Sequence, residues 1–223
     1  MKVEIAENML YSWLRHCMGC QIVQTNYKVA KQWNKTKDMK GLFNDFQADA
    51  RFEDCHFTTT RKGNIYPQSF LTVLNAAECD LVGVLFGGNN TSKVFAYESA
   101  FHESGTKYDN TPKKVMQKIF KNYLMTRSFF PDGEVELAFV SPKMKADDLA
   151  QIKANLKNLK SFISAEHGDT AVNLEVVTGR DFKSKILSPL YKMIGEITDE
   201  SELFIRAVKL LKMMTEAELG KTK

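Results

Sequence analysis

Two apolar strands joined by a glycine turn constrain the fold of this chain more than any other feature. Residues 78–86 read ECDLVGVLF and residues 93–101 read KVFAYESAF, and Gly87, Gly88 and two asparagines lie between them. A turn of this composition is typical of antiparallel neighbours in a sheet. Each strand is apolar on both of its faces. We therefore expect the pair to lie inside a sheet that is covered by helices.

Each of these strands carries one acidic residue within its apolar run. Asp80 lies at the start of the first strand, and Glu98 lies near the end of the second. Because a hairpin places the start of one strand beside the end of the other, we expect the two carboxylates to face each other across the ladder. A carboxylate there is costly unless something pairs with it. The pattern therefore predicts a site for one hard cation, Mg²⁺ or Mn²⁺.

This pattern resembles the core of the PD-(D/E)xK nuclease superfamily, in which an Asp opens one strand and an acidic-x-Lys triplet lies on the next. The order of predicted elements over residues 3–141 is similar as well: a helix, a strand, the Asp strand, the acidic strand, a long helix and another strand. The resemblance implies a restriction-endonuclease-like fold, with a mixed central sheet flanked by helices. It also implies metal-dependent phosphodiester hydrolysis on DNA or RNA.

The resemblance assigns roles to individual residues. It implies the Asp role for Asp80, the acidic role for Glu98 and a further metal ligand in Glu7 of the first helix. The alternative for Glu7 is a solvated carboxylate at the margin of an apolar stripe. On the strand that follows the first helix, the amides of Gln24 and Asn26 share a face, where they are able to reach a phosphate or a catalytic water.

The third position of the motif departs from the family. Ala100 stands where the family has the Lys that helps to activate water and to stabilise the charge developing on the phosphoryl group. Because side chains alternate along a strand, Glu98, Ala100 and His102 fall on one face. We expect His102, or a lysine from elsewhere, to supply the missing polar group. The alternative is a catalytically inactive module that binds nucleic acid or assembles with protein, since a fold does not guarantee its activity.

Two lysine-rich stretches favour a nucleic-acid partner. The formal net charge is only +4, but positive charge gathers locally, in the first stretch beside a tyrosine and a tryptophan. Clustered lysines bind phosphates, and aromatic side chains stack on unpaired bases. The candidate nucleic-acid-binding residues are Lys28, Lys31, Lys35, Lys107, Lys113 and Lys114. The alternative is a pair of solvated helix faces.

The cysteines raise the question of a zinc site. Cys17 and Cys20 form a C-x2-C pair that follows His16, and Cys55-His56 comes later in the chain. Such a set of ligands is able to hold Zn²⁺. However, Cys17 continues the apolar stripe of the first helix, and the turns that accompany such ligands are missing around Cys55. We therefore expect free thiols rather than zinc.

The remaining pattern predicts a single α/β domain over residues 1–223, with 181–217 as a helical extension. After residue 111 helices and strands alternate, which is typical of α/β architecture. Between 34 and 66 the pattern is weak and indicates only one amphipathic helix, near 41–52. The helix expected over 201–214 carries a wide apolar stripe. We expect this stripe to be buried on the chain itself or in a homodimer.

Composition excludes several classes of protein. With 43% hydrophobic and 26% charged residues, the chain is typical of a globular protein. It has no apolar run of the roughly 20 residues that a membrane span needs and no basic leader of a secretory signal, so we expect a cytoplasmic protein without membrane association. It also lacks GxxxxGK[ST], GxGxxG, HExxH and GxSxG, the signatures of common ATPases, dehydrogenases, metalloproteases and hydrolases.

Overall fold

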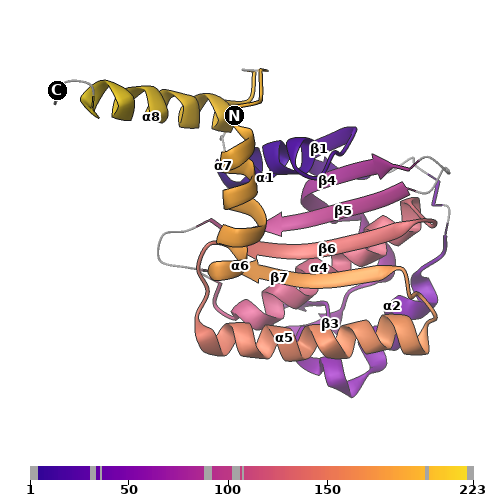
Figure 1. The fold of residues 1–223 in the computed structure, drawn as a ribbon. Coiled ribbons are helices and arrows are strands. Elements are labelled where there is room, and N and C mark those ends of the chain that lie inside the picture. The colour runs from indigo at the N-terminus through magenta and orange to yellow at the C-terminus, as the bar shows by residue number, and fades with distance from the viewer. Residues whose placement is uncertain are drawn as a thin grey trace.

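The computed structural model describes residues 5–30, 34–35, 37–87, 92–101, 106, 108–198 and 201–219. A five-stranded mixed sheet with helices on both faces forms the centre of the molecule (Figure 1). The α/β class and the helix-covered central hairpin predicted from the sequence are therefore confirmed. None of the described helices is both long enough and apolar enough to cross a membrane.

The sheet has the strand order β1-β4-β5-β6-β7. The first three strands pair antiparallel: β1 (Ile22–Lys28), β4 (Glu78–Phe86) and β5 (Ser92–Ser99). The last two, β6 (Glu134–Ser141) and β7 (Val172–Thr178), run parallel to β5. In this sheet β4 alone opposes the other strands. The start of β4 therefore lies at the same edge as the carboxyl ends of the other four, and this edge brings Asp80 and Glu98 together.

One face of the sheet is covered by α4 (Thr111–Phe129) and α5 (Ala146–Ser161), with α2 (Lys40–Ala48) and α3 (Phe70–Asn75) packed beside them. The long helix α4 begins where its sequence favours a helix start. Asn110 accepts a hydrogen bond from the backbone N–H of Lys113 at 3.0 Å, and a proline lies in the first turn. The helix then buries a wide apolar face against β5 and β6.

The opposite face is covered by α1 (Ile5–His16) and by a helical stretch that follows β7. That stretch consists of α6 (Arg180–Phe182), a π-helical segment (Lys183–Leu187) and α7 (Ser188–Met193). Proline in the interior of a helix removes a backbone hydrogen bond and kinks or breaks the helix, and Pro189 lies within this stretch. The structure divides the stretch at this point, since α7 begins at Ser188 directly after the π-helical segment and Pro189 lies in its first turn, where the missing N–H does least harm.

The last helix, α8 (Leu203–Leu219), packs on α1 only through its beginning. Ile205 is fully buried, whereas Leu210 and Leu211 are 59% and 61% exposed. Figure 1 shows α8 extending away from the body of the molecule. The apolar stripe predicted over 201–214 is thus buried on this chain only in part.

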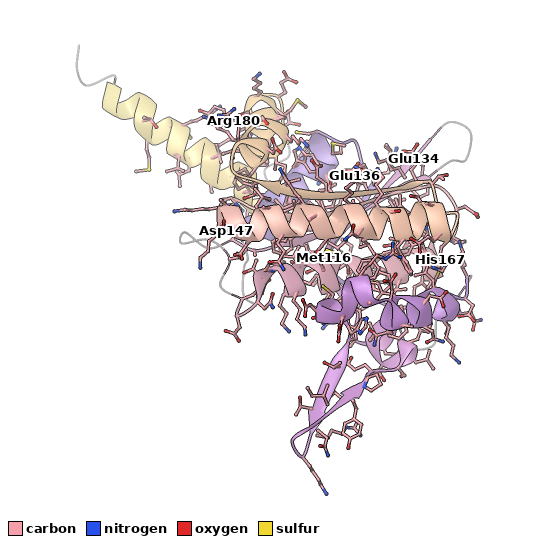
Figure 2. The ribbon with its side chains drawn as sticks, turned by 90° about the horizontal axis from the view of Figure 1, so that it is seen from below. Met116, Glu134, Glu136, Asp147, His167 and Arg180 are labelled. Atoms are coloured by element: carbon pink, nitrogen blue, oxygen red, sulfur yellow. The ribbon has the colours of Figure 1, made fainter. Side chains whose placement is uncertain are left out.

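The region between α1 and the central hairpin contains elements that the sequence did not predict. The helix expected over 41–52 ends at Ala48, because Asp49 accepts a hydrogen bond from the N–H of Arg51 at 2.8 Å and starts a 3₁₀ helix (Ala50–Cys55). A separate two-stranded hairpin follows, made of β2 (Thr58–Arg61) and β3 (Asn64–Pro67). Figure 2 shows this hairpin projecting away from the rest of the molecule.

Candidate active site

Asp80 and Glu98 lie close to each other at the edge where β4 starts and β5 ends. The β4–β5 ladder ends with the pair Leu81 and Tyr97, and Asp80 and Glu98 are the next residue on each strand. Beyond this pair, the Asp80 carboxylate accepts a hydrogen bond from the backbone of β5. Its Oδ2 accepts hydrogen bonds from the backbone N–H of Ser99 at 2.7 Å and from the Ser99 hydroxyl at 3.3 Å. The side chain of Asp80 is thereby held at the strand end.

Glu98 is a buried carboxylate with two partners on α4. Its side chain is 1% exposed. One oxygen forms an ion pair with Lys118 Nζ, and the other accepts a hydrogen bond from Asn122 Nδ2 at 2.9 Å. Lys118 and Asn122 are one helical turn apart and so present their side chains to the same point. Lys118 and Asn122 therefore provide the partners that a buried carboxylate needs.

The charges of this group influence one another. Burial and the nearby charge of Asp80 raise the pKa of Glu98, against the lowering effect of Lys118. Burial alone would lower the pKa of Lys118, but attraction to Glu98 and Asp80 outweighs it and raises that pKa above its ordinary value. Lys118 is therefore a firmly protonated cation at neutral pH.

Lys118 places a cation beside Glu98, which the triplet Glu98-Ser99-Ala100 itself lacks. Ala100, at the third motif position, is buried in the apolar core. The sequence suggested His102 or a lysine from elsewhere as the substitute, and His102 lies outside the described residues. Lys118 was not singled out for this role because its docking against Glu98 depends on the tertiary packing of α4. The available signal was a polar pair, Lys118 and Asn122, set beside the buried face of an apolar helix.

Glu7 reaches the same edge of the sheet through β1. Its Oε2 accepts a hydrogen bond from Asn26 Nδ2 at 2.9 Å. Asn26 lies between two residues that pair with Leu81 and Cys79, and therefore opposite Asp80. The φ angle of Asn26 is 50°, so β1 is distorted at this point. Glu7 belongs to α1 on the face of the sheet opposite α4, and among the described residues it forms no group with Asp80 and Glu98 that could hold a metal ion.

Apolar and weakly polar side chains surround the Glu98–Lys118 pair. Cys79 is fully buried, and its Sγ lies 3.4 Å from Asn122 Nδ2. Burial raises the pKa of the Cys79 thiol, so it is a neutral neighbour rather than a ligand. Tyr108 packs edge-on against Phe139 with ring centroids 6.4 Å apart, and burial likewise raises the pKa of its hydroxyl.

The oxygen atoms of the site differ in whether a protein group already contacts them. In the described part of the chain, Asp80 Oδ1 has no hydrogen-bond partner, and Asn122 Oδ1 is buried without one. No group of three or more His, Cys, Asp or Glu side chains among these residues is placed to hold a metal ion. Mg²⁺ commonly uses one or two carboxylates and fills its other positions with water and phosphate oxygens. Within the described residues, Asp80 has a carboxylate oxygen without a hydrogen-bond partner for such a cation, whereas a cation at Glu98 would have to replace its contact with Lys118 or Asn122.

The predicted nucleic-acid-binding lysines lie in different settings. Lys28 pairs with Glu78 at 2.9 Å, and Lys35 Nζ lies 5.3 Å from the ring centroid of Phe70. Lys113 and Lys114 lie in the first turn of α4, which has no acidic residue. Two further candidates lie outside the described residues, namely Lys31 and Lys107. On α4, the spacing of Lys114, Lys118 and Lys121 places three cations on one helix face that leads to Glu98.

The cysteines that could have formed a zinc site lie on opposite faces of the sheet. Cys20 is buried with α1 on one face, and Cys17 packs against the same cluster. Cys55 is buried in the core of the opposite face. His16 Nε2 lies 2.8 Å from Glu202 Oε1. Because the sheet stands between the two halves of the set, they do not form one tetrahedral site.

Comparisons with protein-family models, curated proteins and solved structures found no match to this chain.

Proposed function

We propose that this protein is a Mg²⁺- or Mn²⁺-dependent nuclease that hydrolyses phosphodiester bonds. The observation that carries the proposal is the contact of Lys118 with Glu98 next to Asp80. It supplies a cation beside two carboxylates at a strand end, although the sequence triplet itself ends in Ala100. A perturbed, buried charge pair at the edge of a sheet is the kind of group that functional sites use.

The order of elements supports the restriction-endonuclease-like part of the proposal. The helix, strand, Asp strand, acidic strand, long helix and strand of that core correspond in order to α1, β1, β4, β5, α4 and β6. The extra elements are inserted between β1 and β4 or follow β6. They leave the edge that carries Asp80 and Glu98 intact.

The residues of the site have separable roles in this mechanism. When bound by Asp80 and Glu98, a divalent cation would lower the pKa of an attacking water and neutralise phosphate charge. Lys118 remains protonated, so it acts as a fixed positive charge for a phosphoryl oxygen and not as a base. Asn122 holds Glu98 in place by its hydrogen bond. Glu7 and Asn26 position polar oxygens and an amide at the β1 side of the same edge.

A second candidate function is a nuclease-like module without catalysis. It is favoured by the fact that both Glu98 oxygens already have protein partners, Lys118 and Asn122. If Lys118 permanently neutralises Glu98, the site holds a structural ion pair, and the protein binds nucleic acid or assembles with a protein partner without cleaving it.

Cleavage assays with matched variants separate the two functions. We expect the wild-type protein to cleave DNA or RNA with Mg²⁺ or Mn²⁺, and Asp80→Asn to abolish this activity by removing a metal ligand. Lys118→Met should lower kcat by about 100-fold or more, as the loss of one preorganised charge donor does. His102→Ala tests whether His102, rather than Lys118, supplies the polar group that the triplet lacks. Lys192→Met on α7 removes a cation on the other face of the sheet and serves as the control.

The outcomes are distinct. A wild-type protein that binds nucleic acid but cleaves no single-stranded, duplex or branched substrate would leave only the inactive module. A larger loss in His102→Ala than in Lys118→Met would assign the polar group to His102 instead. Titration calorimetry with Mn²⁺ tests the ligands directly, because Asp80→Asn should weaken the binding of Mn²⁺ whether or not cleavage occurs.

A further inference from the structure

We propose that the β2–β3 hairpin is a DNA-binding arm that enters the major groove of a duplex lying at the candidate active site. This inference rests on the proposed nuclease function and names double-stranded DNA as the substrate class. It concerns residues 58–67, which lie outside the two lysine-rich stretches that the sequence indicated.

The side chains of the hairpin are exposed to solvent and do not contribute to the core of the molecule. Ile65 is 71% exposed and Tyr66 is 46% exposed, and Thr58, Thr60 and Arg61 are exposed as well. A two-stranded ribbon without a packed face is at best marginally stable by itself. Figure 2 shows it standing clear of the helices and the sheet. Its surface is therefore available to a partner on both faces.

The hairpin carries basic and polar side chains that suit the phosphates and the base edges of DNA. Residues 58–67 contain no Asp or Glu, and Arg61 and Lys62 form no ion pair within the described residues. The ladder pairs Thr59 with Tyr66 and Arg61 with Asn64, which places these four side chains on one face. They line a hollow that continues to Gln68. Arg and Asn side chains are suited to read guanine and adenine edges in the major groove.

Lys62 lies at a position in the turn at the tip where the backbone conformation favours Asn. Lys62 has φ 50° and Gly63 has φ 81°, the left-handed values of a type I′ turn. Asn is preferred over Lys at the first of these positions, because a lysine gains nothing locally from the left-handed conformation. The choice of Lys62 therefore presents a positive charge at the far end of the arm at some cost to the turn.

The base of the arm lies beside the candidate active site. Gln117 Nε2 donates hydrogen bonds to the carbonyl oxygens of Cys55 at 3.3 Å and His56 at 3.0 Å, just before β2 begins. The next residue on α4 is Lys118, the partner of Glu98. The arm and the site are thus attached to the same turn of one helix, so that one duplex is able to contact both.

The dimensions of the arm favour DNA over RNA. Each strand has four residues, which at about 3.4 Å per residue gives an arm roughly 14 Å long, enough to reach the floor of the groove. The major groove of B-DNA is about 12 Å wide and about 8.5 Å deep and accepts a two-stranded ribbon. The major groove of A-form RNA is too narrow for side chains to read. A duplex that the arm enters is therefore DNA.

The test measures duplex binding by the full-length chain in EDTA, so that no cleavage occurs. Fluorescence anisotropy is recorded over a salt series with double-stranded DNA, double-stranded RNA and single-stranded DNA. Lys62→Asn should weaken binding to double-stranded DNA by about 5- to 10-fold and reduce the salt slope by about one. The same variant should keep or raise the melting temperature, because it improves the turn. Lys192→Asn removes one cation on the opposite face of the sheet and should leave binding unchanged.

Each outcome decides the proposal. A loss in Lys62→Asn and in Arg61→Gln that is specific to double-stranded DNA supports the arm, even if the protein proves unable to cleave. Unchanged DNA binding in both variants overturns it, even if the wild-type protein cleaves DNA, and leaves the hairpin edge free to pair with a protein strand. An equal loss with double-stranded RNA or single-stranded DNA would overturn the assignment to the major groove.

Discussion

Glu98 and Lys118 form an ion pair whose members depend on each other. Glu98 is almost fully buried, so the removal of Lys118 would leave a charge with only Asn122 as a partner. Breaking a buried pair on one side typically costs about 3–5 kcal/mol. Lys118→Met should therefore destabilise the protein by an amount near this range at pH 7.5, measured by urea unfolding.

The size of this loss should depend on pH in a defined direction. In Lys118→Met the folded-state pKa of Glu98 rises further above its unfolded value of about 4.3, because the lowering effect of the lysine is gone. A carboxyl group with a raised folded pKa stabilises the fold below the unfolded pKa, and this contribution is lost as pH rises through the folded pKa. The deficit of Lys118→Met should therefore be small near pH 4.3 and largest at neutral pH.

A double variant and a cation test the cause of the loss. Lys118→Met combined with Glu98→Gln removes both charges and should recover most of the stability at pH 7.5. Millimolar Mn²⁺ should also stabilise Lys118→Met, since Glu98 and Asp80 would bind the cation without competition from the lysine. A deficit that is the same at pH 4.3 and pH 7.5 would mean that lost packing, and not the buried charge, causes it.

For single residues, the sequence predicts contacts that are local along the chain and does not predict contacts that depend on tertiary packing. The placement of Asp80 and Glu98 at the same end of the β4–β5 ladder was predictable, because strand periodicity and the turn residues indicate an antiparallel pair. The partner of Glu98 was not, because Lys118 reaches it only after α4 docks on the sheet. Asn26 was placed on the correct strand, but its left-handed φ depends on the surrounding structure.

At the scale of elements, apolar periodicity located the buried strands well. The apolar segments VNLEVVT and EVELAFVS form β7 and β6, in the part of the chain where alternating helices and strands were predicted. The β2–β3 hairpin was missed because TTTR and NIYP have no apolar alternation and no core contact. Its turn residues, around Gly63, were the one available signal.

The helix α8 offers a prediction that separates its two halves. Glu202, just before the helix, accepts hydrogen bonds from Arg15 and His16 at 2.8 Å each, and Ile205 is fully buried. Truncation before Ser201 should therefore destabilise the protein by about 2–4 kcal/mol, the order expected for one buried Ile and a lost charged hydrogen bond. Leu210→Ser with Leu211→Ser should leave the unfolding of the monomer nearly unchanged.

The same pair of leucines tests the predicted homodimer. If α8 covers its exposed stripe with a second copy, light scattering should show a dimer for the wild-type protein and a monomer for the double serine variant. If the serine variant instead loses as much stability as the truncation at concentrations where the protein is monomeric, the stripe packs on its own chain.

For the whole molecule, the alternation of helices and strands was enough to predict an α/β domain, but not the strand order. Placing β1 beside β4 depends on contacts between residues about 60 positions apart, for example Ile22 with Val84. Short-range patterns contain no information on such pairs. The position of the candidate site at one edge of the sheet therefore emerges only from the complete fold.

Each of the two edges of the sheet contains a buried ion pair, and the two pairs have different roles. At the edge opposite Glu98, Arg127 is 2% exposed and bonds to Asp169 through Nε at 2.6 Å and Nη2 at 2.8 Å. It also donates to the carbonyl oxygens of Gly133 at 3.0 Å and Ala171 at 3.2 Å, and so ties the end of α4 to the starts of β6 and β7. All of these contacts are internal, which indicates a structural role.

This difference gives the final prediction. Arg127→Lys keeps the charge but cannot reproduce the planar fork, so it should destabilise the protein by about 2–4 kcal/mol in urea unfolding. At a temperature where the variant is folded, its affinity for Mn²⁺ and for double-stranded DNA should equal that of the wild-type protein. Lys118→Met should show the opposite pattern, with activity lost even under conditions that keep it folded. A folded Arg127→Lys protein with weakened Mn²⁺ binding would show that the two edges of the sheet are coupled, and the candidate site would then extend along α4 beyond Asn122.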